Sequence, residues 1–206
     1  IRLHLFVHKK SLLRFEPYGV VAILSPWNYP FSIPMGEIVQ ALLAGNSVVL
    51  KVSEAVLPVA KLIEDLCNLA TLPKDLIQFL YGGGETGAAL VGSPKVKKIS
   101  FTGSTVVGQK ILEQAAKNLT PCVLELGGKD PAIVLPDADI RKAARGIVWG
   151  AFTNAGQTCA SVERVYVDRN VVQEFTEAVI DETKKLKLKR DVGAVTLKSQ
   201  LGRYRA

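Results

Sequence analysis

The sequence has few residues of the kinds that hold metals or build disulfide frameworks. Its 206 residues contain three cysteines, Cys67, Cys122 and Cys159, and two histidines, His4 and His8. An odd number of widely spaced cysteines fits neither a metal-ligand pattern nor a set of disulfides. We therefore expect no metal site, and a reducing, cytoplasmic location in which the thiols stay free.

Long apolar runs and basic stretches interleaved with aromatic residues are also missing. No run approaches the length of a membrane span, and no charged segment followed by an apolar one opens the chain. The net charge of +7 is concentrated at 184–190, at the end of an expected helix, where cations favour the helix dipole. A nucleic-acid surface would carry stacking aromatics among the basic residues. We expect neither a membrane nor a nucleic acid as partner.

What is present describes an ordinary globular chain. Apolar residues make up 48% of the sequence and charged residues 22%. The length suits one large domain, or one domain and part of a second. The chain opens on Ile1 rather than Met, so we expect that residues upstream are missing.

The first part of the chain alternates between apolar runs and helical patterns. Because the runs are apolar throughout, they predict buried strands of a parallel sheet with helices on both faces, an α/β Rossmann-like fold. Strands are expected at 20–24, 47–52, 76–81, 96–101 and 122–126, and helices at about 32–43, from Pro58 onward, after Gly84 and at about 104–117.

The rhythm changes after Leu126. A strand at 132–135, a helix at 139–153, a strand at 164–167 and a helix at 170–188 are expected there. We place a domain boundary near 153–159. Residues 1–153 then form a dinucleotide-binding domain with a lead-in at 1–15, and 154–206 begin a second α/β catalytic domain that is incomplete.

Cys159 stands in a segment of small and polar residues, 154–161. A structural cysteine usually packs among large apolar neighbours, whereas Cys159 lies between Thr158 and Ala160, with Gly156 three positions earlier. Such a backbone can bend and approach a ligand closely. From this segment alone, Cys159 can be interpreted either as a reactive thiol or as a buried structural thiol.

Two glycine-rich segments could hold a phosphate. Residues 82–87 fit the G-x-G-x-x-G pattern, but they follow the third strand and no acidic residue stands about twenty positions on. A glycine-rich turn is the favoured interpretation there. Residues 101–108 are the better candidate, because a strand runs directly into a helix whose free N–H groups suit a pyrophosphate.

Two polar residues stand at the ends of expected strands. Asn28 follows the first strand between Pro26 and Pro30, and its amide could cap a turn or stabilise an oxyanion. Glu125 interrupts an apolar strand, where desolvation would raise its pKa and suit a general base. A buried ion pair, with Lys129 or Lys51, is the alternative.

Five motifs in order resemble the aldehyde dehydrogenase superfamily, over about residues 15–193. They are 26–30 (PWNYP), 51–54 (KVSE), 101–104 (FTGS), 125–129 (ELGGK) and 156–159 (GQTC). The resemblance implies that Cys159 is the nucleophile, that Asn28 and the Cys159 backbone N–H form an oxyanion hole, and that Glu125 is the general base. It implies cofactor contacts from Trp27, Lys51, Glu54, Gly103, Ser104, Thr105 and Gly108.

The implied reaction oxidises an aldehyde to a carboxylic acid through a cysteine thioester, with hydride transfer to NAD. We expect NAD to be preferred and NADP to be possible, because Glu54 would repel a 2′-phosphate that Lys51 would accept. The resemblance also implies a homo-oligomer in the complete protein.

The sequence departs from the family in two ways. Glu37 stands where many members carry Lys, and family chains are considerably longer than this one. A truncated, non-catalytic nucleotide- or partner-binding protein and a coenzyme-A-acylating aldehyde dehydrogenase therefore stay open as alternatives. A cysteine hydrolase without a redox cofactor would have to use His4 or His8 as its base.

Overall fold

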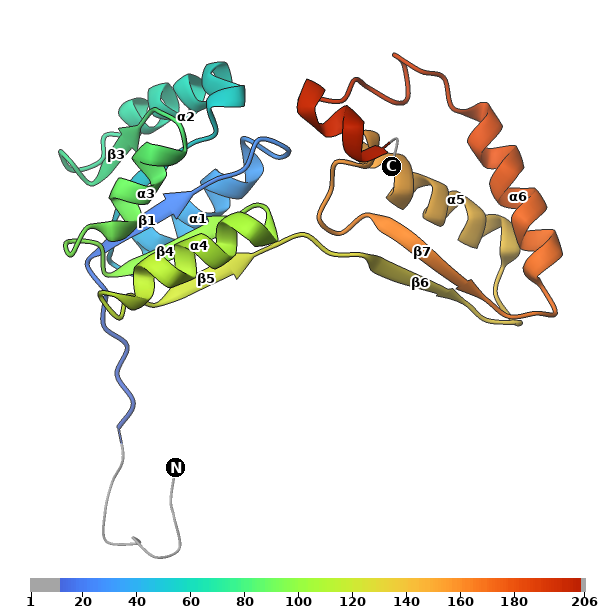
Figure 1. The fold of residues 1–206 in the computed structure, drawn as a ribbon, viewed down its shortest axis with the longest axis horizontal. Helices are drawn as coiled ribbons and strands as arrows, with labels where there is room; N and C mark the ends of the chain where they lie inside the picture. Colours follow the sequence, from blue (N-terminus) through green and yellow to red (C-terminus); the bar gives the residue numbers. More distant parts are fainter. Residues whose placement is uncertain (1–11, 205–206) are drawn as a thin grey trace, which may run out of the picture.

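The computed structural model describes residues 12–204, drawn in colour in Figure 1. His4 and His8, the alternative bases considered above, lie outside the described residues, as does most of the expected lead-in segment. Within the described range, no helix is both long and apolar enough to cross a membrane.

Five parallel strands form the first sheet, in the order β3-β2-β1-β4-β5. This order is that of a doubly wound α/β sheet, in which the strand order reverses between the first strand and the fourth. The strands are β1 (Val20–Leu24), β2 (Ser47–Lys51), β3 (Ile77–Leu80), β4 (Lys98–Thr102) and β5 (Cys122–Glu125).

Helices cover both faces of this sheet. On one face, α1 (Ser32–Leu43) and α2 (Leu57–Leu69) pack on Val21 and Ile23. On the other face, α3 (Gly84–Gly92) and α4 (Thr105–Ala116) pack on Ala22 and Leu24. Because alternate residues of β1 are buried on opposite faces, the run reads as continuously apolar in the sequence. The predicted parallel, doubly covered sheet is confirmed, with strand ends within two residues of those expected.

The second half of the chain forms a separate small sheet. β6 (Asp130–Val134) pairs in parallel with β7 (Val162–Val167). The helix α5 (Ile140–Phe152) connects the two strands, and α6 (Val172–Lys185) follows β7. Figure 1 shows this unit beside the first, joined to it by the segment after β5. A small core of Val134, Ile140, Ala144 and Phe175 holds its helices to its strands.

The two sheets separate at residues 126–129, earlier than the boundary at 153 that the sequence predicts. Because β6 pairs with β7 and not with β5, and α5 packs on α6, residues 130–152 lie with the second sheet. The functional division into a cofactor-binding part and a catalytic part stays a prediction.

The fold brings the predicted site residues to one edge. Carboxyl ends of parallel strands lie at the same edge of a sheet, and ligands bind where the strand order reverses. Here that point lies between β1 and β4, so the segments after Leu24 and after Thr102 face each other.

Candidate active site

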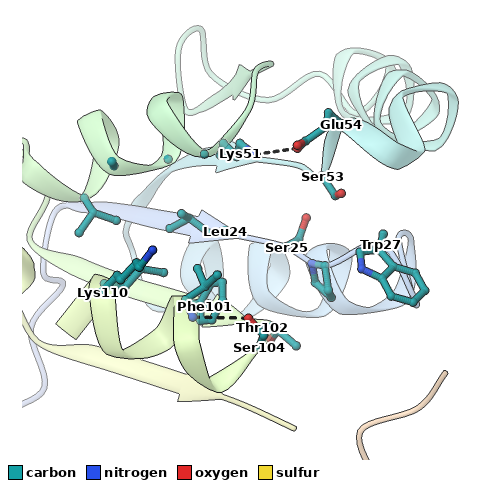
Figure 2. Close-up of a pocket in the computed structure, with 18 of the residues that line it drawn as sticks. Leu24, Ser25, Trp27, Lys51, Ser53, Glu54, Phe101, Thr102, Ser104 and Lys110 are labelled. Carbon is teal, nitrogen blue, oxygen red and sulfur yellow. Dashed lines mark hydrogen bonds and ion pairs between the residues drawn. The ribbon is translucent and has the colours of Figure 1, made fainter. Parts of the chain in front are cut away.

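A cleft of about 690 Å³ opens at this edge, between the segment after β1 and the starts of α3 and α4. Its size lies within the range of cofactor and ligand sites. Figure 2 shows Lys51, Ser53 and Glu54 on one side of it and Phe101, Thr102 and Ser104 on the other. Five of the predicted cofactor residues line it: Trp27, Lys51, Glu54, Gly103 and Ser104.

The start of α4 supplies free backbone donors to the cleft. Ser104 caps the helix, and its Oγ accepts a hydrogen bond of 3.4 Å from the Val107 N–H. The first N–H groups of a helix have no partner within the helix and lie at the positive end of its dipole. Together with the cleft size, this geometry fits the pyrophosphate of a dinucleotide.

Two glycines show how closely the elements approach at the start of α4. A Cβ at Gly103 would lie 2.5 Å from the Phe101 ring, so the turn from β4 into α4 requires glycine. A Cβ at Gly108 would lie 2.7 Å from a Leu126 methyl group. Gly108 and Thr105 do not line the cleft, and the space around Gly108 serves helix packing, so their predicted cofactor contacts have no support here.

The glycine-rich segment 82–87 also borders the cleft. Gly84 and Gly87 line the same wall as the start of α4, and a Cβ at Gly87 would lie 3.3 Å from Leu24. The sequence favoured a simple turn there. The segment therefore shapes the cleft, although it follows the third strand and lacks the ribose-binding acid of the usual fingerprint.

Lys51 and Glu54 form an ion pair on the cleft wall. Lys51 Nζ lies 3.4 Å from Glu54 Oε2, and the Lys51 residue is 8% exposed whereas the Glu54 side chain is mostly exposed. A hydrogen bond from the Glu54 backbone and the nearby Lys51 ammonium lower the pKa of Glu54. Glu54 is thus an anion, and its negative charge partly neutralises the positive charge of Lys51.

The segment around Cys159 is tied to the segment after β1. The Asn28 side-chain Nδ2 donates to the Gln157 carbonyl (2.9 Å), and the Tyr29 hydroxyl lies 2.7 Å from Thr158 Oγ1. These partners are 129 residues apart in the sequence. They bring the candidate thiol to the sheet edge that holds the cleft.

Gln157 holds this segment from within. It is buried, its side chain donates to the Asn154 carbonyl (2.9 Å), and its Oε1 accepts from the Thr196 N–H (2.8 Å). The sequence analysis missed Tyr29 and Gln157 as residues that position the loop. Both stand inside the quoted motifs, but no pattern in the sequence indicates that the two motifs contact each other.

The loop before Cys159 has a left-handed backbone. Asn154, Ala155 and Gly156 have φ values of 53°, 57° and 73°. Asparagine and glycine adopt this region at little cost, whereas alanine pays about 1–2 kcal/mol. Ala155 is therefore the strained residue of the turn.

We expect Ala155→Gly to stabilise the protein by about 0.5–1 kcal/mol, because the relief of strain exceeds the added entropy of the unfolded glycine. The melting temperature measures this gain. Ala143→Gly, the same change within α5, is the control and is expected to cost about 1 kcal/mol. A lower melting temperature for Ala155→Gly would contradict the assignment of strain.

Cys159 differs from the other two cysteines in its surroundings. It is exposed, whereas Cys67 and Cys122 are half-buried and burial raises the pKa of each of their thiols. A raised pKa makes a thiol a poorer nucleophile at neutral pH. Cys67 packs against the core formed by α1 and α2, and Cys122 against that formed by α3 and α4. Among these thiols, Cys159 is the most exposed, which suits a nucleophile that attacks a substrate from solvent.

Asn28 keeps one donor for a ligand. Its amide nitrogen carries two hydrogens, and the contact with Gln157 uses one of them. Its Oδ1 is buried without a hydrogen-bond partner in the described part of the chain. The side chain is thus fixed beside the Cys159 segment, with one N–H still available.

Glu125 is exposed at the end of β5, and this corrects the expectation that it is buried in the strand. β5 is an edge strand of the sheet, and the Glu125 side chain is open to solvent in the described structure. Neither predicted ion pair forms, because Lys129 pairs with Glu163 (2.8 Å) and Lys51 with Glu54. No hydrogen bond or ion pair among the described residues joins Glu125 to Cys159 or Asn28.

No group of three or more metal-ligating side chains gathers anywhere in residues 12–204. The site therefore consists of a dinucleotide-sized cleft, a fixed amide, an exposed thiol and a carboxylate, all at one sheet edge. This set suits covalent catalysis at a carbonyl with a redox cofactor alongside.

Comparison with known proteins identifies the family of the chain. Residues 4–206 match the family model described as the aldehyde dehydrogenase family. The chain is 44% identical over 202 residues to the 4,4'-diapolycopene aldehyde oxidase of Methylomonas sp, covering 95% of this chain and 38% of that protein. It is 37% identical to the D-glyceraldehyde dehydrogenase (NADP(+)) of Picrophilus torridus, covering 88% of this chain and 37% of that protein.

A solved structure gives the same result. The NAD-dependent aldehyde dehydrogenase of Sinorhizobium meliloti superposes with a TM-score of 0.88 at 34% identity, covering 91% of this chain and 39% of that one. The chain thus spans less than half the length of the relatives it matches. Fold, motifs and family model agree, and the chain belongs to the aldehyde dehydrogenase family.

Proposed function

We propose that the complete protein oxidises an aldehyde to a carboxylic acid with NAD as the hydride acceptor. One observation carries the proposal: Trp27 lines the dinucleotide-sized cleft, and the next residue, Asn28, binds the loop that bears Cys159. Adjacent residues thus connect the cofactor cleft with the candidate nucleophile.

The residues divide the chemistry between them. The Cys159 sulfur attacks the aldehyde carbon and forms a thiohemiacetal, whose oxyanion accepts hydrogen bonds from the free Asn28 N–H and the Cys159 backbone N–H. NAD, when bound, supplies the acceptor for the hydride that this carbon loses. Lys51, Glu54 and the start of α4 would hold it.

Hydrolysis of the Cys159 thioester is assigned to Glu125. Its carboxylate takes a proton from water, the water oxygen bonds to the acyl carbon, and the carbon–sulfur bond breaks to release the Cys159 thiolate. Glu125 is exposed, so water reaches it freely. Transfer of the acyl group to coenzyme A would leave Glu125 without a role, so hydrolysis is the favoured outcome.

Product analysis tests this function. The complete protein is incubated with a panel of aldehydes and NAD, with and without coenzyme A, and the products are identified by mass spectrometry. We expect free acid and one NADH per aldehyde, whether or not coenzyme A is present. An acyl-coenzyme A product would establish the alternative activity, and no reduction of NAD with any aldehyde would favour a non-catalytic protein.

Glu54 provides a test of cofactor choice. In Glu54→Gln the charge that repels a 2′-phosphate is removed and Lys51 is released from its ion pair. We expect the ratio of kcat/KM for NADP to that for NAD to rise about tenfold, which corresponds to about 1.4 kcal/mol. Glu85→Gln removes an exposed charge beside the cleft without touching its lining and should leave the ratio unchanged. An unchanged ratio in Glu54→Gln would remove Glu54 from the cofactor site.

The 206-residue chain by itself is expected to be a poor catalyst. Cys159 and Glu125 are both exposed, so water would screen the oxyanion hole and the nicotinamide would lack a fixed position. We expect the isolated chain to oxidise aldehydes at least about 10²-fold more slowly than the complete protein. The rate is measured as NADH formed per protein chain. Comparable rates for the isolated chain and the complete protein would show that the described residues suffice for catalysis.

A further inference from the structure

Glu37 is a carboxylate in a place that the reaction described above does not use. It is the only acidic residue of α1 and lies half-buried where that helix covers the sheet. Its Oε1 accepts hydrogen bonds from the Ser100 hydroxyl (2.8 Å) and the Thr102 hydroxyl (3.5 Å). Its Oε2 is buried and has no hydrogen-bond partner in the described residues. An unpaired buried carboxylate oxygen is costly unless it carries a proton or meets a partner that the reaction supplies.

The sheet places Glu125 on the same side as this carboxyl group. Ser100 and Thr102 are alternate residues of β4, so their side chains point to the same face, toward α1. Thr102 pairs with Glu125 of β5, and residues paired across adjacent strands share a face. Glu37, Thr102 and Glu125 therefore stand in a row.

The groups around Glu37 favour its neutral form. Burial is the main cause that raises the pKa of Glu37 above its ordinary value of 4.5, and the negative charge of Glu125 raises it further. The hydrogen bonds from Ser100 and Thr102 act in the opposite direction and lower it.

β4 carries one cation on this face, Lys98, whose Nζ lies 5.3 Å from the centroid of the Tyr18 ring, at the opposite end of the strand from Thr102. Lys98 is not among the causes that shift the pKa of Glu37. β1 and β2 present apolar side chains to α1. The charged residues of α2 next to them pair among themselves, and Glu64 also accepts a hydrogen bond from the hydroxyl of Tyr81, the residue after β3. These residues are Val21, Ile23, Val48 and Leu50 on the strands and Lys61, Glu64 and Asp65 on α2.

We propose that Glu37 is a positioning residue for Glu125: its carboxyl group gains or loses a proton beside Glu125 and thereby sets the strength of Glu125 as a base. The proposal rests on the proposed role of Glu125 in hydrolysis. When Glu37 is protonated, Glu125 has a neutral neighbour. When Glu37 ionises, the like charge makes Glu125 hold a proton more tightly, which makes it a stronger base.

Hydrolysis of a p-nitrophenyl ester isolates this step from the cofactor. The ester acylates Cys159 and releases p-nitrophenolate in a burst, and the steady-state rate that follows reports hydrolysis of the acyl-enzyme. In the complete protein, we expect this rate to rise with pH in two steps between about pH 4 and pH 9, the upper step being on the order of threefold. The proposal assigns the upper step to the ionisation of Glu37. Glu37→Gln should therefore keep the lower step and lose the upper one.

Two further variants sharpen the result. Ser100→Ala removes a hydrogen bond that favours ionised Glu37, so the upper step should move to higher pH without disappearing. Glu113→Gln, on the exposed side of α4, changes the same charge at a distance and should keep both steps. Wild-type and Glu37→Gln profiles of the same shape would overturn the proposal.

The role of Glu125 itself is tested separately. If Glu125→Gln leaves the steady-state rate unchanged, the proposed function of Glu125 is wrong and the inference falls with it. If Glu125→Gln slows hydrolysis while Glu37→Gln keeps both steps, only the inference about Glu37 is overturned.

Unfolding gives a readout that needs no substrate. A carboxyl group whose pKa is raised by folding contributes stability at low pH, and loses it as pH rises from about 4.5 through the folded value. Glu37→Gln cannot ionise, so its melting temperature relative to the wild type should be higher at pH 8 than at pH 4. The same difference at both pH values would show that Glu37 does not hold a proton in the folded state.

Discussion

Replacing Cys159 with Ala is expected to abolish aldehyde oxidation by the complete protein, with a loss of at least about 10⁴-fold in kcat. Without the sulfur, no thiohemiacetal forms, and the fixed Asn28 amide has no oxyanion to stabilise. Cys159 does not line the dinucleotide-sized cleft, so NAD binding should survive the change. Quenching of tryptophan fluorescence measures that binding, because Trp27 lies in the cleft wall.

The two half-buried cysteines are the matched controls. Cys67→Ala and Cys122→Ala remove a thiol of the same kind from the packed cores on the two faces of the first sheet. We expect each to lose some stability and to keep its activity. Loss of activity in either of these variants, together with a working Cys159→Ala protein, would place the nucleophile elsewhere.

The fold of the first sheet could be predicted from the sequence because burial on both faces leaves a plain signal. Val20 to Leu24 is continuously apolar, and Gly19 and Pro26 bound the run on its two sides. The same reasoning placed the second sheet near its observed position. It registered a change of rhythm after Leu126 but placed the domain boundary at 153–159, because strand pairing depends on which surfaces meet and the sequence does not show that β6 pairs with β7 rather than with β5.

The sequence names candidate residues for the site, whose roles stay predictions, but it does not give the contacts between them. Asn28, Cys159 and Glu125 stand in recognisable motifs, and the cleft gathers Trp27 and Ser104 as expected. The hydrogen bonds that join the two loops connect residues 129 positions apart in the sequence, and no local sequence pattern predicts such bonds.

Burial was the other property that the sequence could not supply. An apolar strand around Glu125 predicted a desolvated carboxylate, but β5 is an edge strand and that side chain is exposed. The carboxyl group that burial does affect is Glu37. Its helix is mostly apolar, and a single acid among its residues looks like part of a solvated face. Only the packing of α1 on β4 shows that this acid points inward.

Replacing Glu125 with Gln separates the two halves of the reaction. The change keeps the size of the side chain and removes the base, so thioester formation should survive while hydrolysis slows by about 10² to 10⁴-fold. Rapid mixing of the complete protein with NAD and aldehyde should show a burst of about one NADH per site, followed by a very slow steady state. Intact-mass measurement should detect the acyl-enzyme on Cys159.

A different result for Glu125→Gln would show which step of the proposed mechanism is wrong. If Glu125→Gln loses the burst but still binds NAD, Glu125 acts before the thioester forms, and deprotonation of the Cys159 thiol becomes its assigned step. If the variant turns over normally, another group activates the water. Glu163→Gln is the matched control: Glu163 lies on β7 and pairs with Lys129, so its loss removes an equal charge without touching the end of β5. Normal burst and normal steady state in that variant, beside a slow steady state in Glu125→Gln, would assign the hydrolytic step to the Glu125 carboxylate.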